Sequence, residues 1–310
     1  MPGRALPSPM REKTDMKQKN KMVRDNVFGY KLIAPTMIYL AIFMLVPFCW
    51  AVWTSFTNKR IGSSMEFVGF ENFILLARDQ VFIRSVVNTV VYTVGAVLGK
   101  LVLGMIIALV LNAAIPFRNI CRVLLFVPWT IPTLVSALTW KWMFSDVGGL
   151  FNYLFRLLHI SEAPVPWLYD AKLAMAAVIT ANIWRGAPFI GISILAGLQA
   201  IPKDYYEAAK IDGANAFYRF THITLPLVKE VTVLSTLITT IWTFNDFEMV
   251  WILTGGGPSN ATQILSTYGY TVGFMNLNLS RAISSSVAAI PFLIILTTII
   301  TKRMRDSAES

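Results

Sequence analysis

Apolar residues gather in six long segments of the chain, separated by more polar stretches. The first segment contains no Asp, Glu, Lys or Arg between residues 32 and 58, which exceeds the run of about 20 apolar residues that crosses a bilayer. Five further segments of similar length follow at 86–111, 123–143, 173–198, 231–253 and 282–301. The pattern predicts an all-α integral membrane protein with six transmembrane helices, the first at 32–54.

The distribution of Lys and Arg predicts which side of the membrane each end occupies. Six crossings place both ends on one side. The basic tail at 1–31 and the short tail at 302–310 are both rich in Lys and Arg. Because cytoplasmic segments are enriched in these residues, we expect a multi-pass plasma-membrane protein whose N- and C-termini are cytoplasmic.

Composition excludes several other classes of protein. Hydrophobic residues make up 55% of the chain and charged residues only 14%, whereas ordinary soluble domains have about 25% charged residues. A net charge of +10 could indicate binding to nucleic acid. However, a basic tail that directly precedes an apolar run is typical of a membrane protein, so we expect no nucleic-acid partner.

Motifs for nucleotide, metal or covalent chemistry are missing. The segment Gly95-Ala-Val-Leu-Gly99-Lys100-Leu101 has three residues between its glycines, where a phosphate-binding loop has four, and it lacks the final Ser or Thr. The two glycines instead match a helix-packing motif. The two histidines, His159 and His222, are expected on opposite sides of the membrane and cannot share a metal. We therefore expect no enzyme active site, no metal site and no cofactor bound to this chain.

Four charged residues well inside the predicted spans are candidates for function: Lys100, Arg185, Asp246 and Glu248. A charge at a helix centre costs at least about 2.5 kcal/mol to insert, so these side chains should face protein or water. Helical spacing adds polar and aromatic candidates for a substrate pathway on the same spans: Asn88, Tyr92, Asn182, Trp242 and Asn245. An aromatic ring beside hydrogen-bonding groups suits a sugar. A structural lock between Arg and a carboxylate is an equally open interpretation.

The connection at 201–226 is the most specific feature of the sequence. We expect Asp204 to cap a short helix that carries Glu207, and Gly213 to permit the left-handed turn that ends it. A second short helix should then run to a break at Pro226. The segment therefore predicts a helix–turn–helix on the cytoplasmic side, which could contact a partner protein or lie on the membrane surface.

Several stretches of the chain resemble the permease subunits of binding-protein-dependent ABC importers. Glu207-Ala208-Ala209, Gly213 and Ile223-Thr-Leu225-Pro226 resemble the EAA motif of these permeases. The stretches 67–73, 126–132, 196–202, 244–247 and 253–258 are similar to the carbohydrate-importing subfamily of the maltose and glycerol-phosphate type. The resemblance runs from about Tyr30 to Arg303.

This resemblance implies the type I ABC importer permease fold in a bacterial inner membrane, with a five-helix core at 84–301 and a coupling loop at 201–226. It implies a carbohydrate substrate, a second homologous permease, an extracytoplasmic solute-binding protein and two cytoplasmic ATPase subunits that hold ATP and Mg. Residues implied to couple to the ATPase are Glu207, Ala208, Ala209 and Gly213, with Leu225 and Pro226 shaping the loop. The implied mechanism is alternating access.

Two other functions stay open from the residues alone. A secondary carrier could use Asp246 or Glu248 as a proton site and would depend on the proton gradient. A channel or structural subunit would show passive flux without a binding protein. The resemblance favours the importer over both.

Overall fold

The computed structural model describes residues 29–113 and 116–308, and these are helical apart from their connections. Residues 1–28 of the predicted basic tail at 1–31 lie outside the described residues. Contacts divide the chain into two units, Met1–Trp53 and Thr54–Ser310, which are described separately. A single β-bridge between Thr57 and Phe67 is the β pairing of the described part.

One apolar helix runs from Gly29 to Ser55 and includes η1 (Ala41–Leu45) and α2 (Val46–Ser55). Its most apolar 18-residue stretch has none of its residues buried within the chain. Met44 and Trp50, for example, expose more than half of their side-chain surface. A helix that is apolar on all sides is stable when lipid or another protein surrounds it.

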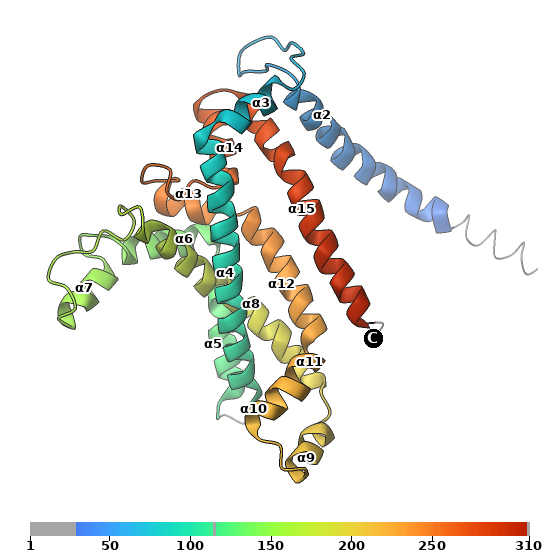
Figure 1. The fold of residues 1–310 in the computed structure, drawn as a ribbon, viewed down its shortest axis with the longest axis vertical. Helices are drawn as coiled ribbons and strands as arrows, with labels where there is room; N and C mark the ends of the chain where they lie inside the picture. Colours follow the sequence, from blue (N-terminus) through green and yellow to red (C-terminus); the bar gives the residue numbers. More distant parts are fainter. Residues whose placement is uncertain (1–28, 114–115, 309–310) are drawn as a thin grey trace, which may run out of the picture. The chain divides into compact units, whose positions relative to one another are not determined.

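The second unit is a bundle around α4, α8 and α12, which pack on one another (Figure 1). Its helices are α3 (Glu71–Arg78), α4 (Gln80–Asn112), α5 (Arg118–Thr130), α6 (Thr133–Met143), α7 (Leu150–Leu157), α8 (Leu173–Ala200), α9 (Lys203–Ile211), α10 (Ala216–Arg219), η2 (Phe220–Thr224), α11 (Leu225–Leu227), α12 (Lys229–Phe244), α13 (Glu248–Thr254), α14 (Leu265–Tyr270), η3 (Thr271–Met275) and α15 (Leu279–Ala308).

Close contact between α4 and α8 organises this bundle, and glycines make the contact possible. A Cβ atom on Gly95 would lie 3.0 Å from Ile179, and one on Gly99 would overlap Ile183. One helical turn or so further along, a Cβ on Gly104 would lie 3.0 Å from the backbone N of Gly191. The helix-packing interpretation of the Gly95–Gly99 motif is therefore confirmed.

The sequence predicts one helix over 123–143, and this prediction is wrong. The segment forms α5 and α6, which meet at an angle of 92°. Pro128 removes a backbone donor inside α5, and Pro132 holds Ile131 in an extended conformation between the helices. Hydropathy could not detect this break because both halves are apolar.

The predicted helix over 231–253 is also interrupted. α12 ends at Phe244, residues 245–247 leave the helix, and α13 begins at Glu248. At its other end, α12 meets the segment of α10 to α11 at 65°. The break expected at Pro226 lies two residues later, at Val228.

Three helices are long and apolar enough to cross a membrane, or five if each bent pair forms one span, as counted in the described residues. The last predicted span, 282–301, lies within the longer α15. The number of six crossings stays a prediction.

Asp79 joins the start of α4 to α14 and α15. Its Oδ1 accepts hydrogen bonds from the first-turn backbone N–H groups of α4. Its Oδ2 accepts from Tyr268 Oη and from the Arg281 guanidinium, both at 2.9 Å. Burial raises the pKa of Tyr268, and the Asp79 carboxylate raises it further, so this hydroxyl stays a hydrogen-bond donor.

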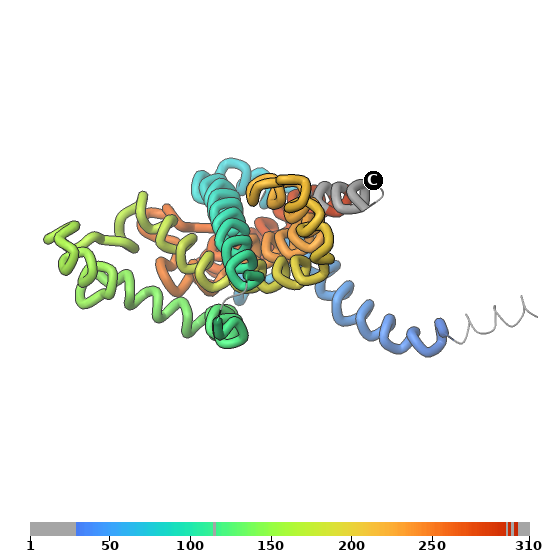
Figure 2. The backbone as a smooth tube through the Cα atoms, turned by 90° about the horizontal axis from the view of Figure 1, so that it is seen from below, coloured from blue at the N-terminus to red at the C-terminus, as the bar shows by residue number. Residues whose placement is uncertain are grey.

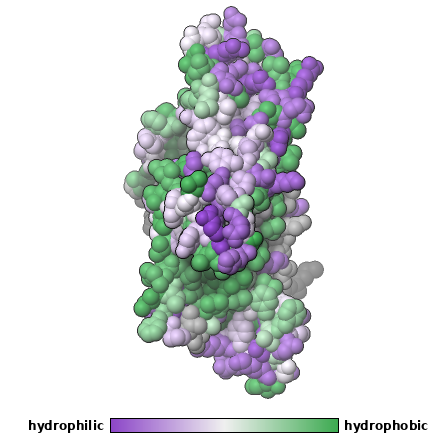
Figure 3. Space-filling view, turned by 90° about the vertical axis from the view of Figure 1, so that its left-hand side faces the viewer, coloured by the Kyte–Doolittle hydropathy of each residue, from purple (hydrophilic) through white to green (hydrophobic). Residues whose placement is uncertain are grey.

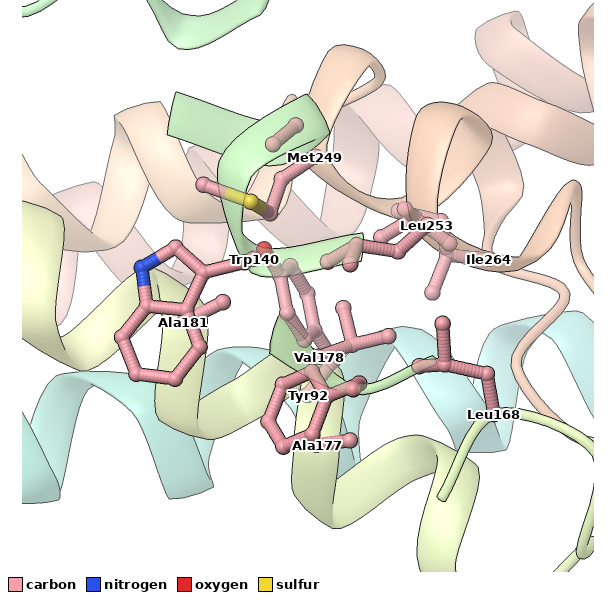
Figure 4. Packing of buried hydrophobic residues seen from close by; sticks show 12 residues of the cluster. Tyr92, Trp140, Leu168, Ala177, Val178, Ala181, Met249, Leu253 and Ile264 are labelled. Carbon is pink, nitrogen blue, oxygen red and sulfur yellow. The ribbon is translucent and has the colours of Figure 1, made fainter. Parts of the chain in front are cut away.

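Two apolar cores fill the bundle at different levels. One gathers around Tyr92, Val178 and Met249, where Trp140 closes one side (Figure 4). The other lies between α4, α8 and Val228, towards α9. The tube view in Figure 2 shows α4 and α8 running next to each other through this arrangement.

Replacing Gly104 with Ala should destabilise the protein, because the new methyl group would meet the Gly191 backbone, which cannot rotate away. Overpacking of this kind costs about 1–3 kcal/mol. The expected result is a lower melting temperature of the purified protein in detergent. Gly269→Ala is the control, since its Cβ would meet only ordinary contacts, the nearest at 3.7 Å. Equal melting temperatures for both variants would contradict the proposed role of the close contact between α4 and α8.

Candidate functional site

A cavity of about 440 Å³ lies among α4, α8, α12 and the break between α12 and α13. Helical spacing brings its wall together, since α8 and α12 each contribute residues three to four positions apart. The lining residues are Lys100, Trp129, Thr133, Asn182, Arg185, Gly186, Phe189, Thr239, Trp242, Thr243, Asn245, Asp246, Phe247 and Glu248. The wall thus combines four charged groups, several hydrogen-bonding groups and four aromatic rings.

The carboxylate of Asp246 is the centre of the hydrogen-bond network at this cavity. Its Oδ2 accepts from Tyr92 Oη on α4 at 2.6 Å and from Asn182 Nδ2 on α8 at 2.8 Å. Its Oδ1 accepts from the backbone N of Met249 at the start of α13 at 3.3 Å. The backbone O of Asp246 accepts from Ser266 Oγ at 2.6 Å. One residue in a helix break therefore binds four other segments.

The two cations of the cavity have few partners in the described chain. Lys100 is 5% exposed, and its Nζ donates to Thr243 Oγ1 at 2.8 Å. Its stem crosses α8 at Gly186, where a Cβ would lie 2.5 Å from Lys100 Cε. Arg185 Nε and Asn182 Oδ1 are buried and have no hydrogen-bond partner among the described residues. These two atoms are therefore buried polar groups without a hydrogen-bond partner in the described chain.

A direct ion pair between helices is not what holds this site. Within the described chain, the ion pairs are His159–Glu162 and Arg281–Asp79, and neither lies at the cavity. The proposed lock between Arg185 and a carboxylate is therefore replaced by neutral donors on Asp246. Glu248 is exposed at the cavity wall.

Aromatic rings form one wall of the cavity. Trp129 stacks on Phe189 at a centroid distance of 5.9 Å and an interplanar angle of 19°. Phe189 in turn contacts Trp242 at 5.0 Å. Because Trp242 is 51% exposed, a face of this group is open. An aromatic face beside amide, hydroxyl and charged groups can bind a ring that has both an apolar face and hydroxyl groups.

Most of the predicted pathway residues come together at this one cavity, and their role in the pathway stays a prediction. Those on its wall are Lys100, Asn182, Arg185, Trp242, Asn245, Asp246 and Glu248. Tyr92 lies behind it, fully buried and bonded to Asp246. Asn88 is elsewhere: its Nδ2 donates to the backbone O of Asn260 and Gln263, both at 3.0 Å, so it holds a loop.

Other lining residues were missed by the sequence analysis: Trp129, Thr133, Gly186, Phe189, Thr239, Thr243 and Phe247. A signal existed for some of them. Phe189 follows Arg185 by four positions, and Thr239 precedes Trp242 by three positions and Thr243 by four. Trp129 and Thr133 approach the cavity from the bend between α5 and α6, which the apolar pattern does not reveal.

The segment 203–227 forms a second candidate site, which we name the knob. α9 carries Glu207, Ala208 and Ala209, and the chain then turns at Gly213, whose φ of +78° favours glycine. Asp204 lies inside the first turn of α9, and Pro202 occupies the cap position, so the predicted Asp204 cap is wrong. Asn215 caps α10 instead, accepting from the backbone N of Tyr218 at 2.8 Å.

The knob exposes an unusual number of apolar side chains for a polar segment. Ile211 is 87% exposed, Phe217 is 75% exposed, and Tyr205 is 56% exposed. Glu207 and Ala208 are exposed as well. Leu225 and Pro226 are exposed where the segment approaches α12. Such a patch on a charged segment is typical of a protein interaction surface.

The surface supports a membrane setting for the part between the cavity and the knob. In Figure 3 hydrophobic residues form a broad area above the lower end of the molecule, and hydrophilic residues gather at that end, where α9 lies in Figure 1.

The described residues contain no group of three His, Cys, Asp or Glu side chains that could hold a metal.

Comparison with known proteins relates the chain to transport permeases. Residues 100–307 match the family described as binding-protein-dependent transport system inner membrane component. The chain is 35% identical over 275 residues to the trehalose/maltose transport system permease protein MalF of Thermococcus litoralis, which covers 88% of this chain and 92% of that protein. It is 31% identical over 310 residues to the sulfoquinovosyl glycerol transport system permease protein SmoG of Agrobacterium fabrum, covering 97% and 100%.

Solved structures show the same fold. A chain from the crystal structure of a bacterial ABC transporter involved in the import of the acidic polysaccharide alginate aligns with a TM-score of 0.80. The alignment covers 93% of this chain and 99% of that chain, at 22% sequence identity. The likeness is therefore one of fold.

Replacing Asp246 with Ala should destabilise the protein, because the Tyr92 hydroxyl and the Asn182 amide would lose their acceptor. Each buried polar group left unpaired costs about 1–3 kcal/mol. The expected result is a clear drop in melting temperature in detergent. Glu248→Ala, which removes an exposed carboxylate two positions away, should leave the melting temperature nearly unchanged. If the two variants melt alike, Asp246 does not hold the site together.

Proposed function

This chain belongs to the family of binding-protein-dependent transport system inner membrane components, and we propose that it moves a sugar or sugar derivative into the cell as the permease subunit of an ATP-driven importer. Its fold is the type I ABC importer permease fold. It is a translocation component of the membrane and not an enzyme. In this proposal ATP and Mg bind to partner ATPase subunits.

The cavity at Asp246 is the observation that supports a sugar substrate. It offers an open aromatic face at Trp242, together with the exposed polar side chains of Asn245 and Glu248 on its wall. Sugars need both, since their rings have an apolar face and a rim of hydroxyl groups. Two relatives over most of the chain are named as permeases for trehalose and maltose and for sulfoquinovosyl glycerol. We therefore place the substrate at this cavity.

The knob is the proposed contact with an ATPase subunit. Its exposed Ile211 and Phe217 provide apolar surface, and Glu207 beside the small Ala208 provides a charge that a partner can approach closely. This surface fits the coupling role that the EAA motif implies for Glu207, Ala208, Ala209 and Gly213. The side of the membrane that carries the knob is then cytoplasmic, together with both termini.

The chain offers a direct mechanical connection between the knob and the cavity. The knob follows the C-terminal end of α8 and leads into α12, and both helices line the cavity. α12 is 16 residues long, which corresponds to about 24 Å of helix. A displacement of the knob by an ATPase would therefore be transmitted along two helices to the substrate, as alternating access between two permease subunits requires.

Glu207→Ala and Gly213→Pro should each abolish ATP-driven sugar uptake and leave the amount of protein in the membrane unchanged. The first removes the exposed charge of the knob, and the second is incompatible with a positive φ. The measurement is whole-cell uptake of radiolabelled trehalose, maltose, sulfoquinovosyl glycerol and glucose. Glu230→Ala, another exposed carboxylate but outside the knob, is the control. Normal uptake in both knob variants would refute the coupling role.

Trp242→Leu should lower the rate of uptake at least tenfold for whichever of the tested sugars the wild type accumulates. This factor corresponds to the loss of about 1.4 kcal/mol of binding free energy. Leu keeps apolar volume but removes the flat face on which a sugar ring stacks. Trp142→Leu is the matched control, because Trp142 is similarly exposed and does not line the cavity. Equal uptake by both variants would exclude this cavity as the substrate site.

A further inference from the structure

A second set of aromatic rings extends from the cavity along α13, α14 and η3. We name this set the outer aromatic row, and it consists of Phe247, Trp251, Tyr270 and Phe274. Phe247 stacks on Trp251 at 5.6 Å and contacts Tyr270 at 5.1 Å. Trp251 meets Tyr270 edge to face at 4.8 Å, and Tyr270 meets Phe274 at 5.3 Å. Each ring touches the next without interruption.

The outer aromatic row connects the cavity with the surface. Phe247 lines the cavity itself. The exposed fraction then rises along the row, to 37% at Tyr270 and 61% at Phe274. α13 and α14 lie at the opposite end of the bundle from α9 and the knob (Figure 1). The row therefore runs outward from the cavity on the side where a solute would arrive.

The row is fixed to the same residue that organises the cavity. Phe247 directly follows Asp246, and the Ser266 hydroxyl, in the turn of α14 that precedes Tyr270, donates to the Asp246 backbone O at 2.6 Å. The rings at the inner end are thus held in register with the wall of the cavity. The row therefore begins at the cavity wall, at Phe247.

The row also has the chemistry of a carbohydrate surface. Its rings offer apolar faces, and the Trp251 indole N–H and the Tyr270 hydroxyl add polar groups at the ring edges. A row of Leu or Val would be equally compatible with lipid, but it would offer neither flat ring faces nor polar groups. Overlapping rings also provide a series of similar, weak positions, so a sugar can move from one to the next without losing all of its contacts at once.

We propose that the outer aromatic row is an outer subsite, on which the ring of an incoming sugar stacks before it reaches the cavity. This inference rests on the proposed function of the cavity as a sugar site. It adds a second binding position with its own residues, and it predicts that ring faces matter there, not only apolar volume.

The test uses cysteine labelling in cells that carry the intact importer, with Cys49 and Cys121 replaced by Ser. Phe274→Cys places a thiol at the outer end of the row, and a membrane-impermeant thiol reagent measures its accessibility. Saturating amounts of the sugar that the wild type accumulates should slow labelling at least threefold. Phe70→Cys is the matched control, because Phe70 is 68% exposed and belongs to a separate ring cluster with Phe56 and Phe73. Its labelling should not change.

Uptake rates provide the second measurement. Trp251→Leu should lower the rate at least fivefold, and Trp251→Phe should restore it to within twofold of the wild type, because Phe returns a ring face. Phe70→Leu should have no effect. Protein levels in the membrane are measured for each variant. If the Trp251→Leu protein does not accumulate in the membrane, the labelling of Phe274→Cys alone tests the outer subsite.

Labelling of Phe274→Cys that is unaffected by sugar, or wild-type uptake in Trp251→Leu, would overturn the outer subsite while leaving the cavity proposal intact. A further outcome is that the wild type accumulates none of the four radiolabelled sugars and no sugar from a soluble extract of its own cells. In that case the proposed function fails, and the outer subsite fails with it. The two failures are therefore distinguishable.

Discussion

The acceptor capacity of one carboxylate determines how the site is built. A charge at membrane depth is costly unless it is paired, and Asp246 is paired by donors on three different segments, two of them side chains from α4 and α8. Those donors would in turn be unpaired without it. The carboxylate thus joins the break after Phe244 to α4, α8 and α13, and the backbone O of the same residue attaches α14. Asp246 itself lines the cavity.

Rigid and pliant parts of the bundle can be separated on physical grounds. Where α4 and α8 cross at Gly104 and Gly191, backbone lies against backbone, and neither helix can shift without a clash. The bends at Ile131, at Val228 and at residues 245–247 interrupt the helical hydrogen-bond ladder instead. Changes of shape require least energy at these bends. The cavity adjoins the first and third of them, and the knob adjoins the second.

Much of this site could be predicted from the sequence, but only one helix at a time. Helical spacing placed Asn182 with Arg185 and Trp242 with Asp246, and the cost of intramembrane charge identified Arg185 and Asp246 as candidates. Hydropathy did not predict the bends at Pro132 and after Phe244, because it records how apolar a segment is and not its direction. Pro128 and Pro132 were a signal for the first of these bends. Which helices face one another is a tertiary property. For that reason Trp129 was missed, and Asn88, which was grouped with the pathway, lies away from the cavity.

The exposed side chains of the knob affect how a cell must produce this protein. Ile211 is 87% exposed and Phe217 is 75% exposed. Chaperones and proteases recognise exposed apolar surface of this kind. Under the proposed coupling role, a molecule synthesised without the ATPase subunit that covers the knob would therefore be an orphan subunit, subject to degradation. Matched production of the two proteins then follows as a requirement of the knob's own surface chemistry.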